Sequence, residues 1–164
     1  MSDRHIQVKT LTPEAFAPFG SVIDRSCLEP RAMNAGMARR FHDLAKIEIA
    51  GQDARVVIGV VEAKAYPVPL NLPLVERHPL GAQAFVPLTD APFLVVVCHD
   101  ENGRPGRPQA FVTTAGQGVC YGMNVWHGVL TPFGAPQDFI VIDRNGPGVN
   151  LEEHVFDEPW IVTI

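Results

Sequence analysis

Short apolar runs, broken every few residues by proline or glycine, are the feature that most limits the folds open to this chain. The 164 residues include 15 prolines and 14 glycines, and such residues interrupt regular elements and mark turns. Between the breaks, valine, isoleucine and phenylalanine dominate runs of strand length. No helical patterns of about 10–15 residues alternate with these runs, as a doubly wound parallel sheet would require. The chain is therefore predicted to be an all-β sandwich or barrel.

One short helix is predicted near the start of the chain. Thr12 suits the N-cap, Pro13 the first helical position and Glu14 the first turn, and Gly20 is expected to stop the helix. Residues 45–50 alternate but form too short a run to assign. The predicted strands are residues 7–11, 21–24, 39–44, 55–61, 72–78, 83–88, 93–99, 109–113, 126–131, 138–144 and 159–164.

The length and a hydrophobic share of 46% predict one domain, residues 1–164, with a sizeable core. No apolar run approaches the ~18 residues that a membrane helix needs, and no secretory signal precedes the first strand. We therefore expect no membrane partner. The polar residues 100–108 predict a surface loop rather than a domain linker.

The charge and the cysteines indicate the setting in which the chain works. A net charge of -5, with no basic stripe, argues against a nucleic-acid partner. A local arginine can still bind a small anionic substrate inside a cleft. The cysteines, Cys27, Cys98 and Cys120, have no metal-type spacing, so we expect free thiols in the cytoplasm.

Polar residues in two separate segments indicate a functional site. Glu76 and His78 are two apart in a strand-like run and so point to the same face. Gln83 follows after room for a tight turn, and His127 supplies a second imidazole. If they converge, they form a site for a small polar molecule. The alternative is that each histidine is a hydrogen-bonded core residue.

The same segments resemble the two motifs of cupins, which are small double-sheet jelly-roll barrels. Glu76, His78 and Gln83 keep the spacing of the first motif, although glutamate replaces a histidine and glutamine replaces the usual glutamate. The resemblance implies a cupin-type double-stranded β-helix with a short N-terminal helix. The spacing of the second motif is kept by Gly116, Gly122, Asn124 and His127.

Several blocks narrow the resemblance to the ureidoglycolate lyase family. The likeness covers roughly residues 6 to 146 and implies an enzyme that splits (S)-ureidoglycolate into glyoxylate and urea, late in allantoin breakdown. It also implies a cytoplasmic homodimer and, as assigned to some members, a divalent metal such as nickel. The alternatives are a cupin enzyme for another small hydroxy acid or amide, and a non-catalytic small-molecule-binding cupin. The blocks are residues 11–16, 19–23, 40–45, 76–81, 83–87, 124–127 and 138–144.

The implied reaction needs a base near the substrate hydroxyl, an acid near the leaving nitrogen and a cation for the carboxylate. His78 and His127 are candidates for proton transfer or for metal ligation. Glu76 either orients a histidine, acts as the base or is a third metal ligand.

A planar cation suits the substrate carboxylate, which favours arginine over lysine. Among Arg40, Arg77 and Arg144 we prefer Arg40, which shares a block with His42. Arg77 should point away from the site, and surface ion pairing is the alternative role for each arginine.

Other polar residues are candidates for binding the rest of the substrate. The amide of Gln83 suits a ureido group, with a structural role as the alternative. Tyr121 and Asn124 are expected to line the pocket, although asparagine also favours turns. Trp126 should lie on the face opposite His127, and Trp126 or Trp160 is a candidate for a subunit contact.

Overall fold

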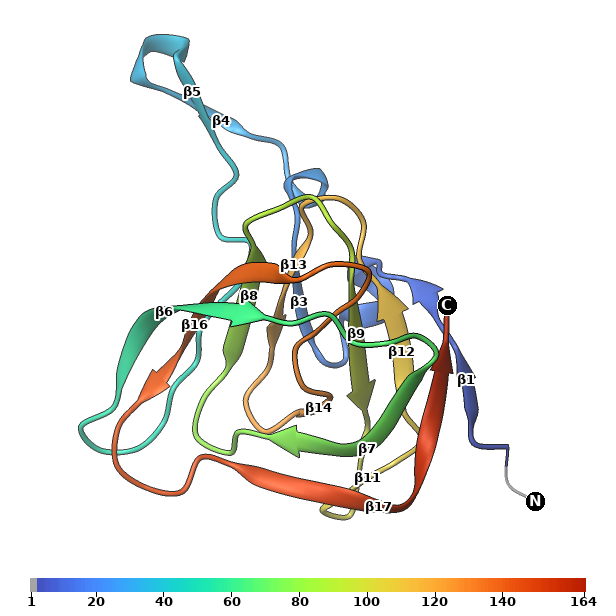
Figure 1. Ribbon diagram of the computed structural model, residues 1–164. Coiled ribbons are helices and arrows are strands. Elements are labelled where there is room, and N and C mark those ends of the chain that lie inside the picture. The colour runs from blue at the N-terminus through green and yellow to red at the C-terminus, as the bar shows by residue number, and fades with distance from the viewer. Residues whose placement is uncertain (1–2) are drawn as a thin grey trace.

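The computed structural model describes residues 3–164, most of which form β-strands (Figure 1). The expected barrel-like fold is confirmed, because the larger sheet curls until it nearly closes on itself. Its outer strands, β1 and β2, follow one another along the chain. In spatial order the sheet contains β1 (His5–Gln7), β17 (Glu152–Thr163), β7 (Leu70–Arg77), β14 (Trp126–His127), β9 (Phe93–Cys98), β12 (Gln109–Val112) and β2 (Lys9–Thr10), and β15 (Thr131–Pro132) also pairs with β9.

A second sheet of five strands packs against the first. Its spatial order is β3 (Gly20–Ile23), β13 (Gly118–Tyr121), β8 (Gln83–Pro87), β16 (Gln137–Asn145) and β6 (Arg55–Ala63). The remaining elements are the strand pairs β4 (Arg31–Met33) with β5 (Ala38–Arg40) and β10 (Asp100–Glu101) with β11 (Arg104–Pro105), the helix α1 (Pro13–Phe16) and the 3₁₀ turns η1 (Arg25–Cys27) and η2 (Asn34–Gly36).

Strand β9 contributes to two hydrophobic cores, one on each face. Val95 and Val97 belong to the core that includes Phe139 of the second sheet. Leu94 and Val96 belong to another core, enclosed by the curl of the larger sheet. Because every residue of β9 is buried, the strand reads as an unbroken apolar run rather than an alternating one.

The predicted helix is confirmed, but its stop signal is wrong. The hydroxyl of Thr12 accepts a hydrogen bond from the backbone N–H of Ala15 at 3.2 Å, and α1 ends at Phe16. Gly20 instead opens β3, with a φ of +151°. A Cβ there would lie 1.9 Å from the carbonyl oxygen of Cys120 on β13. No helix among residues 3–164 is long and apolar enough to span a membrane.

Four strand predictions differ from the structure. The predicted strand 7–11 is divided between β1, which ends at Gln7, and β2, which covers only Lys9 and Thr10. The predicted strand 126–131 is two short strands, β14 and β15. The predicted strand 39–44 ends at Arg40, and the predicted strand 159–164 belongs to the longer β17. Strand β13 was missed because Gly118, Cys120 and the following Gly122 give a weak strand signal.

The tryptophans are also placed differently from one expectation. Trp126 packs in the core enclosed by the larger sheet, on the face opposite His127, as predicted. However, Trp126 and Trp160 are only 3% and 8% exposed. The idea that they form an exposed subunit contact is therefore wrong for this structure.

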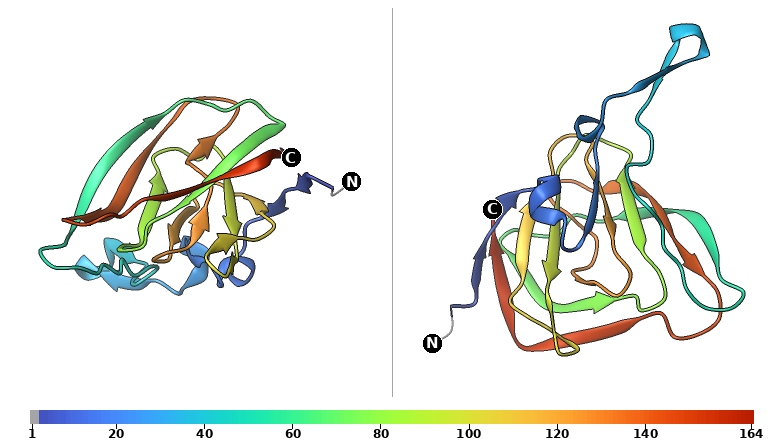
Figure 2. Two further views of the ribbon diagram at one scale, coloured as in Figure 1. Left: turned by 90° about the horizontal axis from the view of Figure 1, so that it is seen from below. Right: turned by 180° about the vertical axis from the view of Figure 1, so that it is seen from behind.

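Residues 31–40, called the arm below, extend away from the body of the molecule (Figures 1 and 2). Strands β4 and β5 form a two-stranded sheet of their own. Nine of the ten arm residues are exposed, Ala38 being half-buried. At the tip, Asn34, Ala35 and Gly36 all have positive φ. The arm therefore contributes almost nothing to the cores of its own chain.

The close approach of β3 to β13 predicts that Gly20 tolerates no side chain. Gly20→Ala would place a methyl group against the Cys120 carbonyl, so we expect it to lower the free energy of unfolding by roughly 3 kcal/mol or more. Urea unfolding followed by fluorescence measures this. Gly134→Ala is the matched control, since Gly134 has a φ of +79° but open space around it, and should lose about 1 kcal/mol. Equal losses in the two variants would contradict the steric argument.

Candidate active site

Three side chains converge where β7 and β14 meet. The ladder sets His127 of β14 directly opposite Glu76 of β7, and His78 follows two residues after Glu76 on the same side. One ligand atom from each residue lies within 4.8 Å of the other two. The two imidazole ring centroids are 5.2 Å apart, and Nε2 of His78 lies 3.9 Å from Oε1 of Glu76. The convergence expected from the sequence is present.

The hydrogen bonds of both histidines fix which ring nitrogen is available. Nδ1 of His127 lies 2.9 Å from the carbonyl oxygen of Gly128, and Nδ1 of His78 lies 2.8 Å from that of Asn150. A carbonyl can only accept, so each Nδ1 carries a proton and each neutral ring keeps its lone pair on Nε2. Both Nε2 atoms are buried and have no hydrogen-bond partner among residues 3–164. Two nitrogen lone pairs therefore await a ligand.

Burial holds His127 in its neutral form. Its ring is 2% exposed and stacks on Tyr121 with centroids 4.1 Å apart. Desolvation, opposed by the hydrogen bond to Gly128 and helped by His78, lowers the pKa of His127 to about 3. At neutral pH this imidazole is an acceptor or a metal ligand rather than a proton donor.

Glu76 has the opposite tendency. Burial raises the pKa of its carboxyl group, the nearby His78 opposes that shift, and Glu153 adds to it. Glu153 lies directly opposite Glu76 on β17. A partly desolvated carboxylate next to an imidazole is well placed to accept a proton.

Gln83, Tyr121 and Asn124 lie around the three residues in different ways. Gln83 is opposite Tyr121 in the ladder of β8 and β13, and its amide donates to the Asp143 carboxylate at 3.2 Å. Tyr121 is buried and stacks on His127. Asn124 has a φ of +64°, and its backbone N–H donates to the carbonyl oxygen of His78 at 2.8 Å. The structure therefore gives Asn124 a turn role that positions the segment bearing His78.

The arginines considered for the substrate carboxylate have different surroundings. Arg144 is buried and donates to the carbonyl oxygens of Ala50, Gly146 and Pro147. Arg40 lies at the base of the exposed arm, opposite Arg31, and His42 is exposed just beyond it. Neither Arg40 nor His42 lies in the cluster of Glu76, His78 and His127.

Arg77 holds three parts of the structure together. Its guanidinium binds Glu152 of β17 at 2.6 Å and Asp100 of β10 at 2.9 Å, and lies 4.3 Å from the centroid of the Trp126 ring. The indole N–H of Trp126 donates to the same Asp100 carboxylate. These contacts lie on the face of β7 away from the cluster, as strand alternation predicted for Arg77.

Two residues of this region were missed by the sequence analysis. Asn150 holds both ends of the segment after β7, because its carbonyl bonds His78 and its side-chain oxygen accepts from the backbone N–H of Leu80 at 2.7 Å. Asp143 binds the Gln83 amide. A backbone carbonyl leaves no signal in a sequence, whereas a carboxylate inside the apolar run of β16 could have marked Asp143.

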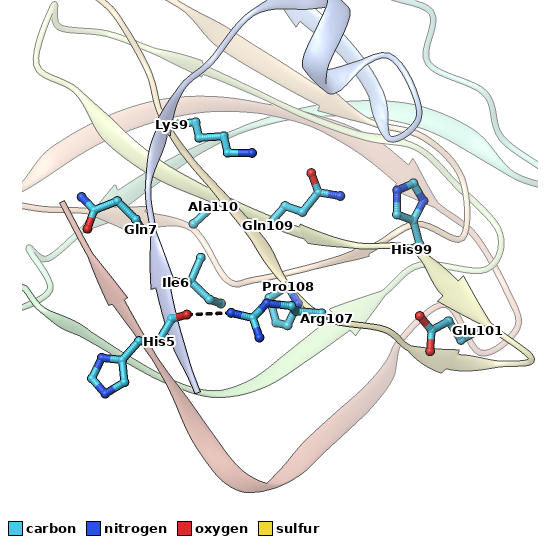
Figure 3. Close-up of a pocket in the computed structure, with 10 residues that line it drawn as sticks. All are labelled: His5, Ile6, Gln7, Lys9, His99, Glu101, Arg107, Pro108, Gln109 and Ala110. Atoms are coloured by element: carbon cyan, nitrogen blue, oxygen red, sulfur yellow. Dashed lines mark hydrogen bonds between the residues drawn. The ribbon is translucent and has the colours of Figure 1, made fainter. Parts of the chain in front are cut away.

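A cavity of about 510 Å³ lies elsewhere, beside β1, β2 and β12 (Figure 3). Arg107 in its wall donates to the carbonyl oxygen of His5 at 2.8 Å. His5, Lys9, His99 and Glu101 also line it, yet among residues 3–164 only Glu76, His78 and His127 are grouped closely enough to hold a metal. We therefore take the three-residue cluster as the candidate active site.

Comparisons with known proteins agree on one family. The family model described as "Ureidoglycolate lyase" matches residues 3–163. A ureidoglycolate lyase of Chelativorans sp. (strain BNC1) is 55% identical over 157 residues, which is 96% of this chain and 95% of that protein. One of Mesorhizobium japonicum is 54% identical, covering 94% and 95% of the two chains. Ureidoglycolate lyase 2 of Rhizobium meliloti is 50% identical, covering 96% of each.

The buried state of His127 predicts a particular loss of stability in acid. Its pKa falls from 6.5 to about 3 on folding, so below pH 6.5 the unfolded chain takes up a proton that the folded chain does not. We expect this residue to lower the free energy of unfolding by about 2 kcal/mol between pH 7 and pH 5. Urea titrations in chelator of wild type and His127→Gln measure the difference. The same pH slope in both proteins would contradict it.

Proposed function

The chain belongs to the ureidoglycolate lyase family, and on that basis we propose that it cleaves (S)-ureidoglycolate into glyoxylate and urea in allantoin breakdown. One observation supports this most directly. Glu76, His78 and His127 each offer a ligand atom within 4.8 Å of the other two, both histidine Nε2 atoms lack a hydrogen-bond partner among residues 3–164, and the carboxylate is partly desolvated. That set can bind a small polar substrate and move protons on it.

The reaction is an elimination that needs one proton removed and one supplied. Loss of the hydroxyl proton turns the C–O bond into the aldehyde carbonyl of glyoxylate as the carbon–nitrogen bond breaks. The bonding electrons stay on the nitrogen, which takes a proton and leaves as urea. No water is consumed, so the protein is a carbon–nitrogen lyase.

The electrostatics of the cluster support one division of labour. Glu76, with its raised pKa, accepts the hydroxyl proton and passes it to the free lone pair on Nε2 of His78, which then delivers it to the leaving nitrogen. His127 stays neutral and accepts a hydrogen bond or binds a cation through its Nε2. The 3.9 Å between Nε2 of His78 and Oε1 of Glu76 is longer than a hydrogen bond, so this transfer requires a small movement of either side chain or one bridging water.

The rest of the substrate needs two further contacts. An amide presents paired donor and acceptor groups that match a ureido group, so Gln83 is its proposed partner, oriented by Asp143. The carboxylate needs a cation. Arg77 and Arg144 already bind other groups, which leaves Arg40 as the proposed partner, with His42 beside it.

The alternative role of the same three residues is to hold a divalent metal such as nickel. Nε2 of His78, Nε2 of His127 and the Glu76 carboxylate would hold it, since imidazole and carboxylate donors suit such ions. Bound there, the ion would make the substrate hydroxyl more acidic and orient the reacting carbon.

The proposal also includes a cytoplasmic protein formed of one cupin-like domain, residues 1–164. Strands β1 and β17, near the two ends of the chain, pair in parallel, which supports a single domain. Cys27, Cys98 and Cys120 are all free thiols, which supports a reducing compartment.

Homodimer formation is the last part of the proposal. Strand β6 is the edge of the second sheet, and its Val56, Ile58 and Val60 form an outward-facing apolar stripe, with Ile58 74% exposed. A long apolar edge strand invites pairing with another copy.

The lyase activity is tested by release of glyoxylate and urea from each enantiomer, corrected for spontaneous breakdown. Wild type should act on the S enantiomer, and Glu76→Gln should lower kcat by about 10²–10⁴-fold, because a positioned base is lost. His99→Ala, a histidine outside the cluster, is the matched control and should leave kcat unchanged. Wild-type release at the spontaneous rate for both enantiomers would reject the assignment. A change in affinity alone would indicate a binding protein.

Metal binding is tested on protein stripped with chelator. We expect calorimetry to show one nickel ion per chain, and His78→Ala to weaken binding by about 10-fold or more, because one of the ligands is removed. His5→Ala controls for surface histidines. No nickel binding by wild type, or equal binding by His78→Ala, would contradict the metal proposal.

A further inference from the structure

The arm, residues 31–40, has several features that would make it unstable if it were surrounded only by water. It is a two-stranded hairpin, and an isolated hairpin is at best marginally stable in water. Met33 and Met37 on it are 40% and 88% exposed. The left-handed backbone of Ala35 at its tip is unfavourable for a residue with a Cβ. A surface outside the chain would stabilise such an arm.

The charges of the arm indicate what that surface carries. The register of β4 and β5 sets Arg31 directly opposite Arg40, so two guanidinium groups share one face of the hairpin. Like charges in this position repel each other. No salt bridge or side-chain hydrogen bond of either arginine occurs within residues 3–164. An anion on that face would relieve the repulsion.

The candidate active site has carboxylate groups but, within residues 3–164, lacks a free cation. Glu76 lies opposite Glu153, and Asp143 is bound to the Gln83 amide. Arg77 and Arg144, the arginines of β7 and β16, are occupied by the partners described above. A carboxylate substrate entering this acidic site needs a cation that its own strands do not offer.

The arm also leads away from the site of its own chain. In Figure 1 and in the right-hand view of Figure 2 it extends beyond one end of the body, whereas β7 lies at the other. Strand β5, which ends at Arg40, therefore lies at the opposite end of the molecule from β7, which carries Glu76 (Figure 1). An arm that extends to a second copy of the chain could instead bring Arg40 to the candidate active site of that copy.

We propose that two copies of the chain exchange arms, so that Arg40 of each binds the substrate carboxylate in the site of the other. The inference rests on the proposed lyase function and adds to it that one chain alone has an incomplete site. A twofold axis makes the exchange reciprocal and closed. Each site then receives the arm of the other copy, whose arginines are positively charged where the site is negatively charged.

Complementation between two inactive variants tests this exchange. Arg40→Ala and His127→Ala are co-expressed with different tags, and the mixed dimer is isolated by two affinity steps. In that dimer the Arg40→Ala chain has intact histidines and receives an intact arm. Each variant alone should lose at least about 10-fold in kcat/KM, and the mixed dimer should regain about half of wild-type activity, since one of two sites is complete.

Two matched controls make the result specific. Arg39→Ala, on the other face of the arm, should lower kcat/KM less than about 2-fold. A chain carrying both Arg40→Ala and His127→Ala, paired with wild type, should give an inactive mixed dimer, because the intact histidines then receive a defective arm. If His127→Ala does not fold, Glu76→Gln replaces it.

The outcomes separate this inference from the proposed function. Recovery in the first mixed dimer supports arm exchange. An active wild type whose mixed dimer stays inactive, or whose pairing with the double variant is half active, overturns arm exchange and keeps the lyase. Light scattering supplies a readout independent of activity. Wild type should be a dimer, replacement of residues 31–40 by a short glycine–serine turn should favour the monomer, and a monomeric wild type would overturn the exchange even in an inactive protein.

Discussion

The pairing of β14 with β7 is the constraint on which the rest of the site depends. It sets His127 opposite Glu76, and strand alternation then brings His78 to the same side. A slip by one residue would put Trp126 inside the site and His127 in the apolar core. The pairing is fixed because Trp126 and Val96 fill the core on one face while His127 stacks on Tyr121 on the other. Packing on both sides of one sheet thus determines the chemistry between the sheets.

The sequence predicted what depends on alternation and spacing. The mainly β fold, the Thr12 cap and the common side of Glu76 and His78 follow from local patterns, and the structure confirms them. The outward direction of Arg77 is another such prediction. The same rules could not reveal that Asn150 fixes His78 through a carbonyl, because backbone groups are common to all residues.

What the sequence could not reveal depends on long-range packing. A glycine after a short helix is typical of a helix stop. Gly20 is instead required because the Cys120 carbonyl, from a strand distant in sequence, lies where a Cβ would be. The sequence alone does not distinguish Arg144 from Arg40 as a partner for the substrate carboxylate. One is buried among carbonyl groups and the other stands on an exposed hairpin. Only the tertiary structure distinguishes a guanidinium that holds a loop from one able to meet a ligand, so the choice among the arginines required coordinates.

The contacts of Arg77 have a consequence for how this family can vary. Asp100 belongs to a polar hairpin whose sequence is typical of a surface loop. Its carboxylate nevertheless holds both Arg77 and Trp126, the immediate neighbours of Glu76 and His127 along their strands. Insertions or deletions around β10 and β11 would therefore alter the rigidity of the catalytic cluster from outside the barrel. Length variation tolerated at other turns of the molecule should be selected against at this one.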